Sequence, residues 1–161
     1  MTATLTDFNE LIEFLEIQDT DFLLVGDGAS RSDSRRVSWA GILLSRHAAS
    51  IKQFRGVMTP GTIAEAESMP TIQAINWIVR TYRRWLHRQR GRPVTFDLVT
   101  DSVALQSAIN DRQAKLKLAR SVRIASILEA RQRGFLFRAH RPHKEVKRLH
   151  HLCHVKSYSL L

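Results

Sequence analysis

Apolar and polar positions divide the first sixty residues into one amphipathic helix and three strands. In residues 7–18 apolar side chains recur at helical spacing, and the polar face opposite them is acidic. These apolar side chains are Phe8, Leu11, Ile12 and Leu15. A continuous apolar run over 22–25 is typical of a central strand that is buried on both faces. Further strands are predicted at 37–44 and 51–58, and the short polar turns between the three strands favour an antiparallel meander.

The rest of the chain alternates helices with strands. A long helix is predicted to extend to about residue 89, and a fourth strand follows at 94–100. Helical sequence covers roughly 102–132, and a fifth strand at 135–139 precedes a final helix at 144–157. This order predicts an α/β protein with a mixed five-stranded sheet, in which three antiparallel strands are followed by two parallel ones, flanked by helices.

Length and composition are those of an ordinary globular protein. A chain of 161 residues, 43% hydrophobic and 25% charged, is expected to form one domain over 21–161, with 1–20 as an acidic amphipathic helical extension at the N-terminus. No apolar run approaches the ~20 residues of a membrane helix, and the acidic N-terminus is unlike a signal peptide. The one cysteine, Cys153, cannot form an internal disulfide. We therefore expect a soluble, intracellular protein, located in the cytoplasm and not bound to membranes.

Positive charge is concentrated in the larger part of the chain. The net charge is +10, yet residues 1–30 contain seven acids and no Lys or Arg. Residues 31–161 hold all 25 basic residues against eight acids, a net charge of +17. A basic body of this kind favours nucleic acid as the partner, through contacts to phosphate. The alternative is a basic surface without a specific partner.

Three acids lie at the predicted ends of two strands and near the start of a helix. Asp27 follows the first apolar strand, Asp101 follows the fourth strand, and Glu67 lies near the start of the long helix. Each has an ordinary explanation by itself, because Asp27 could cap a turn and Asp101 could be the N-cap of the next helix. Glu65 competes with Glu67, although counting from Thr62 favours Glu67. Only the joint pattern of the three carboxylates predicts a functional site.

The segments around these acids resemble the ribonuclease H (type 1) family. Asp27-Gly28-Ala29-Ser30-Arg31 is similar to the end of the family's first strand, and 62–67 is similar to the Thr-x-x-x-Ala-Glu start of its first helix. Thr100-Asp101-Ser102 resembles the third acidic motif, and His151-Leu152-Cys153-His154 resembles Asn-x-x-Asp. The order of elements is also the family's, and the resemblance covers about 22–157.

The resemblance implies a metal-dependent endonuclease that hydrolyses the RNA strand of RNA/DNA hybrids by a two-metal-ion mechanism. Asp27, Glu67, Asp101 and His154 would hold two Mg²⁺ or Mn²⁺ ions, since hard cations require oxygen-rich ligand sets. His143, in the loop before the last helix, would assist proton transfer. No small-molecule cofactor is expected, and the protein is expected to be a monomer.

Several residues depart from the family pattern. His154 stands where a fourth carboxylate is usual, and an imidazole suits Mn²⁺ better than Mg²⁺. Pro70 falls inside the predicted long helix, which therefore either begins near Ser68 or is kinked. His150 and His154 have the i, i+4 spacing of a zinc site, but the lone cysteine makes zinc a weak alternative. Two other functions stay open: a catalytically weak or inactive nucleic-acid-binding module, and a related nuclease acting on double-stranded RNA or DNA junctions.

Polar and basic residues outside the acidic motifs are predicted to contact nucleic acid. They are Ser30, Arg31, Thr62, Ser102, Arg83, Arg84, Arg88, Lys115, Lys117 and Arg120. For the basic residues, the alternative is a solvated helix face. The acidic N-terminal helix either covers an apolar edge, or lies against the basic body and competes with nucleic acid.

Overall fold

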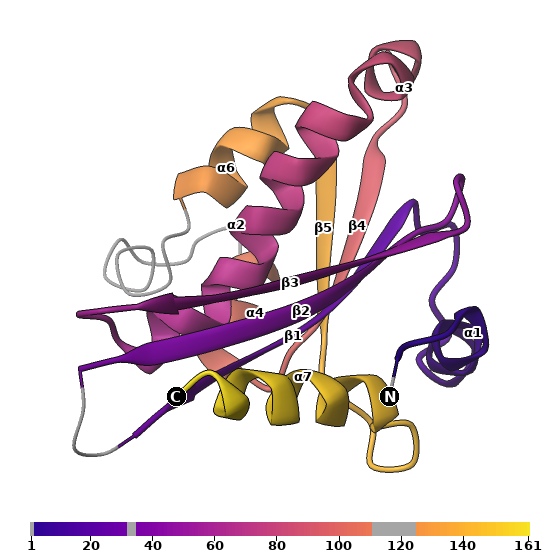
Figure 1. The fold of residues 1–161 in the computed structure, drawn as a ribbon. Coiled ribbons are helices and arrows are strands. Elements are labelled where there is room, and N and C mark those ends of the chain that lie inside the picture. Colours follow the sequence, from indigo (N-terminus) through magenta and orange to yellow (C-terminus); the bar gives the residue numbers. More distant parts are fainter. Residues whose placement is uncertain (1, 32–34, 111–124) are drawn as a thin grey trace.

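A five-stranded sheet lies at the centre of the molecule, seen in a computed structural model that describes residues 2–31, 35–110 and 125–161 (Figure 1). Its strands are β1 (Phe22–Ser30), β2 (Val37–Ser45), β3 (Ser50–Met58), β4 (Val94–Val99) and β5 (Phe135–His140). They are arranged in the order β3-β2-β1-β4-β5. The first three strands pair antiparallel, whereas β4 pairs parallel with both β1 and β5. The predicted mixed sheet of three antiparallel and two parallel strands is confirmed.

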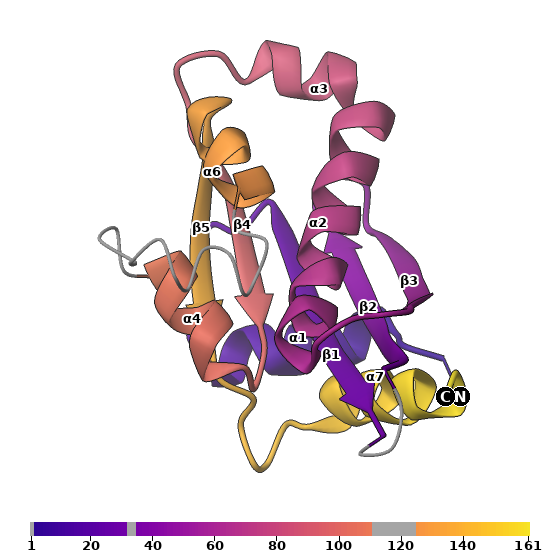
Figure 2. The same ribbon diagram turned by 90° about the vertical axis from the view of Figure 1, so that its left-hand side faces the viewer.

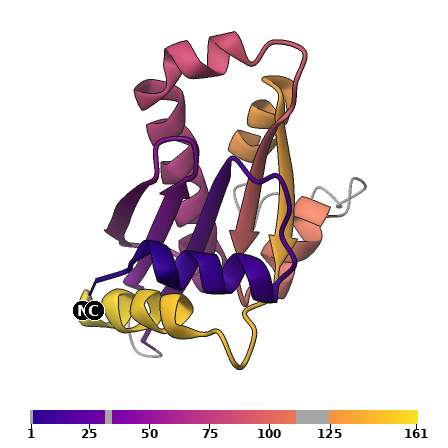
Figure 3. The same ribbon diagram turned by 90° about the vertical axis from the view of Figure 1, so that its right-hand side faces the viewer.

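Helices cover both faces of the sheet. In chain order they are α1 (Leu5–Phe14), α2 (Ile63–Thr81), α3 (Arg83–Arg88), α4 (Val103–Asn110), α6 (Ala125–Gln132) and α7 (Arg148–Ser159). Figures 2 and 3 show α2, α4 and α6 on one face, and α1 and α7 side by side on the other. Leu24 of β1 joins the core under α2, while Leu23 and Val25 join the core under α7. The unbroken apolar run in this strand therefore serves two cores, because successive side chains point to opposite faces.

The first strand is longer than predicted, and its glycines explain why. Gly26 and Gly28 do not end β1, since they continue the ladder opposite Gly41 and Trp39 of β2. A Cβ on Gly26 would lie 3.0 Å from the Cβ of Pro70, and a Cβ on Gly41 would lie 2.9 Å from the same atom. The two glycines thus let α2 approach the sheet at its proline. Since α2 begins at Ile63, the alternative of a helix start near Ser68 is wrong, and Pro70 lies in the helix interior.

Other element boundaries differ from the predictions for local reasons. A capping box between Thr4 and Asp7 starts α1 at Leu5, and the helix stops at Phe14. The long helix predicted to residue 89 is interrupted at Tyr82, which separates α2 from α3. The helical stretch predicted over 102–132 contains α4 and α6, and residues 111–124 lie outside the described part of the chain.

The last helix begins later than residue 144. A bridge between His143 and Val146 closes a turn first, and α7 then starts at Arg148.

The N-terminal helix is an integral part of the core under α7. Phe8 and Leu11 are buried in that core. Asp7 forms an ion pair with Arg148 of α7, with 3.0 Å between Oδ1 and Nε. Three other acids of this segment are exposed and form no ion pair within the described residues, so covering apolar surface is the role that the packing supports. They are Glu10, Glu13 and Glu16.

Among the described helices, none is both long enough and apolar enough to cross a membrane.

Candidate metal centre

The sheet register brings Asp27 and Asp101 to the same edge. Val25 and Val99 are the last partners in the parallel ladder between β1 and β4. Asp27 and Asp101 each follow their valine by two residues, so the two carboxylates leave the sheet at the same level. Asp27 was predicted at the end of a strand, but it lies inside β1, opposite Ala40 of β2. It is therefore held by a strand ladder and does not cap a turn.

Glu67 approaches these aspartates from the first turns of α2. A Cβ on Gly28 would lie 2.9 Å from the Cγ of Glu67, so the glycine allows the helix to pass directly over β1. Glu65, the alternative considered from the sequence, belongs to the cap of its own helix, where its backbone N–H donates to Thr62 Oγ1 (3.2 Å). Ser102 Oγ accepts from the backbone N–H of Leu105 (3.2 Å) and is the N-cap of α4. Ser102 takes the cap role that was considered for Asp101, whose carboxylate stays available.

Two histidines of α7 complete the cluster. His154 Nδ1 hydrogen-bonds Asp27 Oδ2 at 2.8 Å. His150 Nε2 lies 3.8 Å from Asp27 Oδ1 and 3.6 Å from Asp101 Oδ2. The i, i+4 spacing puts both rings on one side of the helix. Sequence reasoning noted this spacing only as a weak zinc signal and did not assign His150 to the acidic cluster.

The charges of the cluster are poorly balanced. Burial, opposed by His154 and reinforced by the negative charge of Asp101, raises the pKa of Asp27. Burial likewise raises the pKa of Glu67, against the nearby Ser102 hydroxyl and with the help of the two aspartates. His150 lowers the pKa of Asp101, which burial opposes. Burial disfavours the imidazolium, but the carboxylates of Asp101 and Asp27 outweigh it and raise the pKa of His150.

The donor set of this cluster fits a divalent cation. Asp27, Asp101 and His150 each offer one ligand atom, and these atoms all lie within 4.8 Å of one another. Glu67 is electrostatically coupled to both aspartates and adds a further carboxylate. Carboxylate oxygens are the preferred ligands of Mg²⁺ and Mn²⁺, and clustered carboxylates repel one another when no cation is bound. The cluster is thus suited to hold metal.

Not every residue predicted for the site lies in this cluster. His143 packs against Phe14 of α1 with the two rings tilted by 45° and 4.0 Å between their centroids, and its Nδ1 accepts from the backbone N–H of Glu145 (3.2 Å). The ring of His143 therefore contacts α1 and its own turn rather than the acids. Ser30 and Arg31 are exposed at the end of β1.

The predicted basic contacts fall into two groups. Arg83, Arg84 and Arg88 are exposed on α3, at the end of α2 that is opposite to Glu67 (Figure 1). At ~1.5 Å per residue, the helix between them and Glu67 is roughly 20 Å long. Lys115, Lys117 and Arg120 lie outside the described residues.

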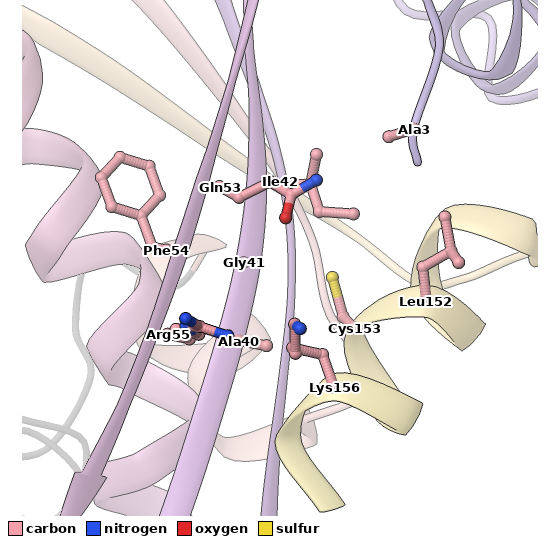
Figure 4. A pocket seen from close by; sticks show the side chains of 10 residues that line it. All are labelled: Ala3, Ala40, Gly41, Ile42, Gln53, Phe54, Arg55, Leu152, Cys153 and Lys156. Carbon is pink, nitrogen blue, oxygen red and sulfur yellow. The ribbon is translucent and has the colours of Figure 1, made fainter. Parts of the chain in front are cut away.

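A separate cavity of about 340 Å³ lies on the other side of α7, against β2 and β3 (Figure 4). Ala40, Ile42 and Cys153 line its apolar part, and Arg55 and Lys156 are its basic residues. None of the acidic residues of the cluster lines this cavity. Burial raises the pKa of the Cys153 thiol, so the thiol is an unreactive packing group.

Comparison with known proteins identifies solved structures that share this fold. No protein-family profile and no curated protein sequence matches the chain. Solved structures do: the N-terminal RNase H domain of a Mycobacterium tuberculosis protein has a TM-score of 0.59 at 14% identity, covering 88% of this chain and 96% of that one. RNase H1 of Halobacterium salinarum has a TM-score of 0.56 at 18% identity, with 87% and 98% covered. LC11-RNase H1, solved in complex with an RNA/DNA hybrid, has a TM-score of 0.55 at 13% identity, with 86% and 98% covered.

These structures share the mixed five-stranded sheet flanked by helices. The chain therefore has the ribonuclease H fold, which confirms the fold expected from the sequence motifs.

Proposed function

We propose that this protein is a metal-dependent endonuclease of the ribonuclease H type, which cuts the RNA strand of an RNA/DNA hybrid with two divalent ions. The observation that carries the proposal is the convergence of Asp27, Glu67 and Asp101 at one edge of a ribonuclease H-fold sheet. The raised pKa values of Asp27 and Glu67 support it, because perturbed carboxylates concentrate at functional sites.

The protein's own residues would bind and orient the metal ions. When bound, two divalent ions supply an activated water and neutralise the charge that develops on the phosphate and the leaving oxygen. Asp27, Glu67 and Asp101 are the carboxylates that would hold them. His154 fixes the orientation of Asp27 through its 2.8 Å hydrogen bond, as outer-shell groups do for metal ligands. The side chain of His154 is 49% exposed, so the ring is in contact with solvent as well as with Asp27.

The role proposed for His143 is secondary, since its ring packs on Phe14. General acid–base groups contribute about 100-fold or more to a rate. We expect His143→Ala to lower kcat by much less than that. A loss of about 100-fold would instead support a direct role of His143 in proton transfer.

A cleavage assay tests the proposal directly. Labelled RNA/DNA hybrid, double-stranded RNA and double-stranded DNA are incubated with the protein and Mg²⁺ or Mn²⁺, with and without chelator. We expect cleavage of the RNA strand in the hybrid only, with dependence on the metal. Glu67→Gln should abolish cleavage, and Glu65→Gln, a matched change two residues away, should leave it nearly intact.

A second candidate function is supported by His154, which replaces a carboxylate that related enzymes usually carry. In that case the protein binds nucleic acid without cutting it. Tight binding of the hybrid with no cleavage under either metal favours this function, and cleavage of double-stranded RNA favours a related nuclease.

We further propose that Arg83, Arg84 and Arg88 bind the phosphates of the same duplex at a distance from the cut. No Asp or Glu occurs between Glu67 and Asp97, and these three arginines form no ion pair within the described residues. Roughly 20 Å of helix separates them from Glu67, which corresponds to about six base pairs at ~3.4 Å each.

Duplex length distinguishes this contact from a solvated helix face. Arg83→Gln/Arg84→Gln should weaken binding of an 18-base-pair hybrid, lowering the salt slope by ~0.9 for each phosphate that is no longer neutralised. Binding of a 5-base-pair hybrid should be unchanged. Lys52→Gln/Arg55→Gln on the edge strand β3 removes the same charge elsewhere, and an equal effect from this control would contradict the proposal.

A further inference from the structure

We propose that His150 is a direct ligand of the bound cation, together with Asp27 and Asp101, and that its nitrogen makes the centre favour Mn²⁺ and Co²⁺ over Mg²⁺. The inference rests on the proposed function only in placing a divalent ion at these carboxylates. It does not require that the protein cuts nucleic acid.

The position of the imidazole nitrogen is the first observation. Nε2 of His150 is buried and has no hydrogen-bond partner among the described residues. Its distances of 3.8 Å to Asp27 Oδ1 and 3.6 Å to Asp101 Oδ2 are too long for hydrogen bonds. Two ligands of one ion, each with a metal bond of about 2.1 Å, stand ~3–4 Å apart. Both distances from His150 are therefore those of ligands that share an ion, and the ligand atoms of all three residues lie within 4.8 Å of one another.

The two histidines of α7 differ in what they contact. His154 Nδ1 is already occupied by Asp27 Oδ2 at 2.8 Å, and its side chain is 49% exposed. The His150 side chain is only 18% exposed, and it faces the other oxygen of Asp27. His154 is thus placed as an orienting group and His150 as a ligand, the reverse of what the family resemblance implied for His154.

The fold holds His150 in place. Leu149 and Cys153 are 3% and 1% exposed and anchor this side of α7 in the core. Arg148, two residues before His150, forms its ion pair with Asp7 of α1. The ring therefore sits on a helix turn that is fixed from both sides, which limits its freedom to move away from a cation.

The identity of the donor determines the metal. Mg²⁺ is a hard cation that takes oxygen ligands and keeps its waters, whereas imidazole nitrogen binds more strongly to transition metals. Affinity for such sites rises from Mn²⁺ to Co²⁺. A centre of two carboxylates and one buried imidazole is therefore expected to discriminate against Mg²⁺.

Metal binding to the full chain, without nucleic acid, tests the proposal. Calorimetric titrations with Mg²⁺, Mn²⁺ and Co²⁺ measure affinity, and pulsed electron paramagnetic resonance of bound Mn²⁺ detects coupling to an imidazole nitrogen. We expect the unmodified protein to bind Mn²⁺ at least about 10-fold more tightly than Mg²⁺, and to show the nitrogen coupling.

Substitutions assign the nitrogen. His150→Gln should abolish the coupling and weaken Mn²⁺ binding by at least the ~10–100-fold that loss of an outer-shell partner costs, with a much smaller change for Mg²⁺. His150→Asp should shift the preference towards Mg²⁺. His151→Gln is the matched control, because His151 is the exposed neighbour on α7, and it should change neither affinity nor coupling. Circular dichroism verifies that each variant is folded.

Several results would overturn the assignment: bound Mn²⁺ without nitrogen coupling, coupling that survives in His150→Gln, or no measurable Mn²⁺ binding. Failure of the proposed function is a separate result. Nitrogen coupling without cleavage contradicts only the nuclease activity, and cleavage without nitrogen coupling contradicts only the role of His150.

Discussion

Asp27 and Asp97 are two buried aspartates on the same face of the sheet, and their surroundings differ sharply. Their side chains are 3% and 0% exposed. Asp97 lies on β4 beside Leu23 of β1. Leu23 precedes Asp27 in the same strand, so the two aspartates lie at different positions along the sheet. Both bury a carboxylate, and both contact a histidine. Burial alone therefore does not explain what either residue does.

Asp97 has a guanidinium cation and an imidazole ring built into the protein around it. Arg138, its partner on β5, donates from Nε to Oδ1 at 2.9 Å and from Nη2 to Oδ2 at 2.8 Å. His140 Nε2 lies 2.7 Å from Oδ1. Although burial acts in the opposite direction, these two partners lower the pKa of Asp97. Arg138 also donates to the carbonyl oxygen of Gln18 at 2.9 Å, which ties the segment after α1 to the sheet.

Asp27 has no guanidinium partner among the described residues, and burial together with the negative charge of Asp101 raises its pKa. The comparison shows that the same fold contains one buried carboxylate paired with a guanidinium and one without such a partner among the described residues, which the proposed function assigns to a cation. The first is expected to stabilise the fold, because a paired buried charge is costly to unpair. The second is expected to serve function at some cost in stability.

The largest expected difference concerns activity. Asp27→Asn should lower hybrid cleavage by more than the ~100-fold that loss of an outer-shell partner costs, because a proposed ligand is removed. Asp97→Asn should leave kcat within a few-fold of the unmodified enzyme when it is assayed well below its melting temperature. Steady-state rates at saturating metal measure both. Equal losses in the two variants would erase the distinction between the aspartates.

The next difference concerns stability, with the opposite ranking. Asp97→Asn should reduce the free energy of unfolding by about 3 kcal/mol, because it leaves Arg138 and His140 without their buried carboxylate. Asp27→Asn should leave the unfolding free energy unchanged or increase it when metal is absent. Urea unfolding in the presence of chelator measures both. A large loss of stability in Asp27→Asn would show that this residue is also structural.

The smallest expected difference is in the response to acid. The folded-state pKa of Asp97 is depressed, so its stabilisation is present above about pH 4 and is lost as the pH falls through the folded pKa. The folded-state pKa of Asp27 is raised, so its destabilisation is present above that pKa and is relieved as the pH falls towards about 4.

Urea unfolding of the metal-free proteins at pH 7, 5 and 3 tests both signs. The stability gap between the unmodified protein and Asp97→Asn should shrink below about pH 4. Any difference in unfolding free energy between the unmodified protein and Asp27→Asn should already be small at about pH 4. Gaps that do not vary with pH would mean that neither carboxylate changes its pKa on folding.

Much of this molecule was predictable from local patterns. The apolar run before Gly26 marked a doubly buried strand, and apolar positions at helical spacing placed α1. Such periodicity reports which elements form and which faces are buried, because burial follows the repeat of each element. The identity of the acids near strand and helix ends also indicated a cluster before any contact was known.

Other features depended on contacts between distant segments. The glycines of β1 suggested a strand end, but Pro70 of α2 packs against Gly26, Glu67 packs against Gly28, and the strand continues to Ser30. The resemblance indicated His154 as a metal ligand but did not indicate His150, which the packing of α7 on the sheet brings near both aspartates. The spacing of residues within a single element predicts neither the orientation of α7 on the sheet nor the close approach of α2 to the strands.

The sequence by itself determined the order of the elements and the mixed sheet, because hydrophobic periodicity is a local property. Residue type is also local, and it was enough to indicate Asp27, Glu67 and Asp101 as candidate site residues. Tertiary structure alone decided that Asp27 stands level with Asp101, that His150 lies near both, and that Arg138 neutralises Asp97. The physical reason is that strand register and helix orientation are set by side chains packing across the sheet, between residues far apart in the chain.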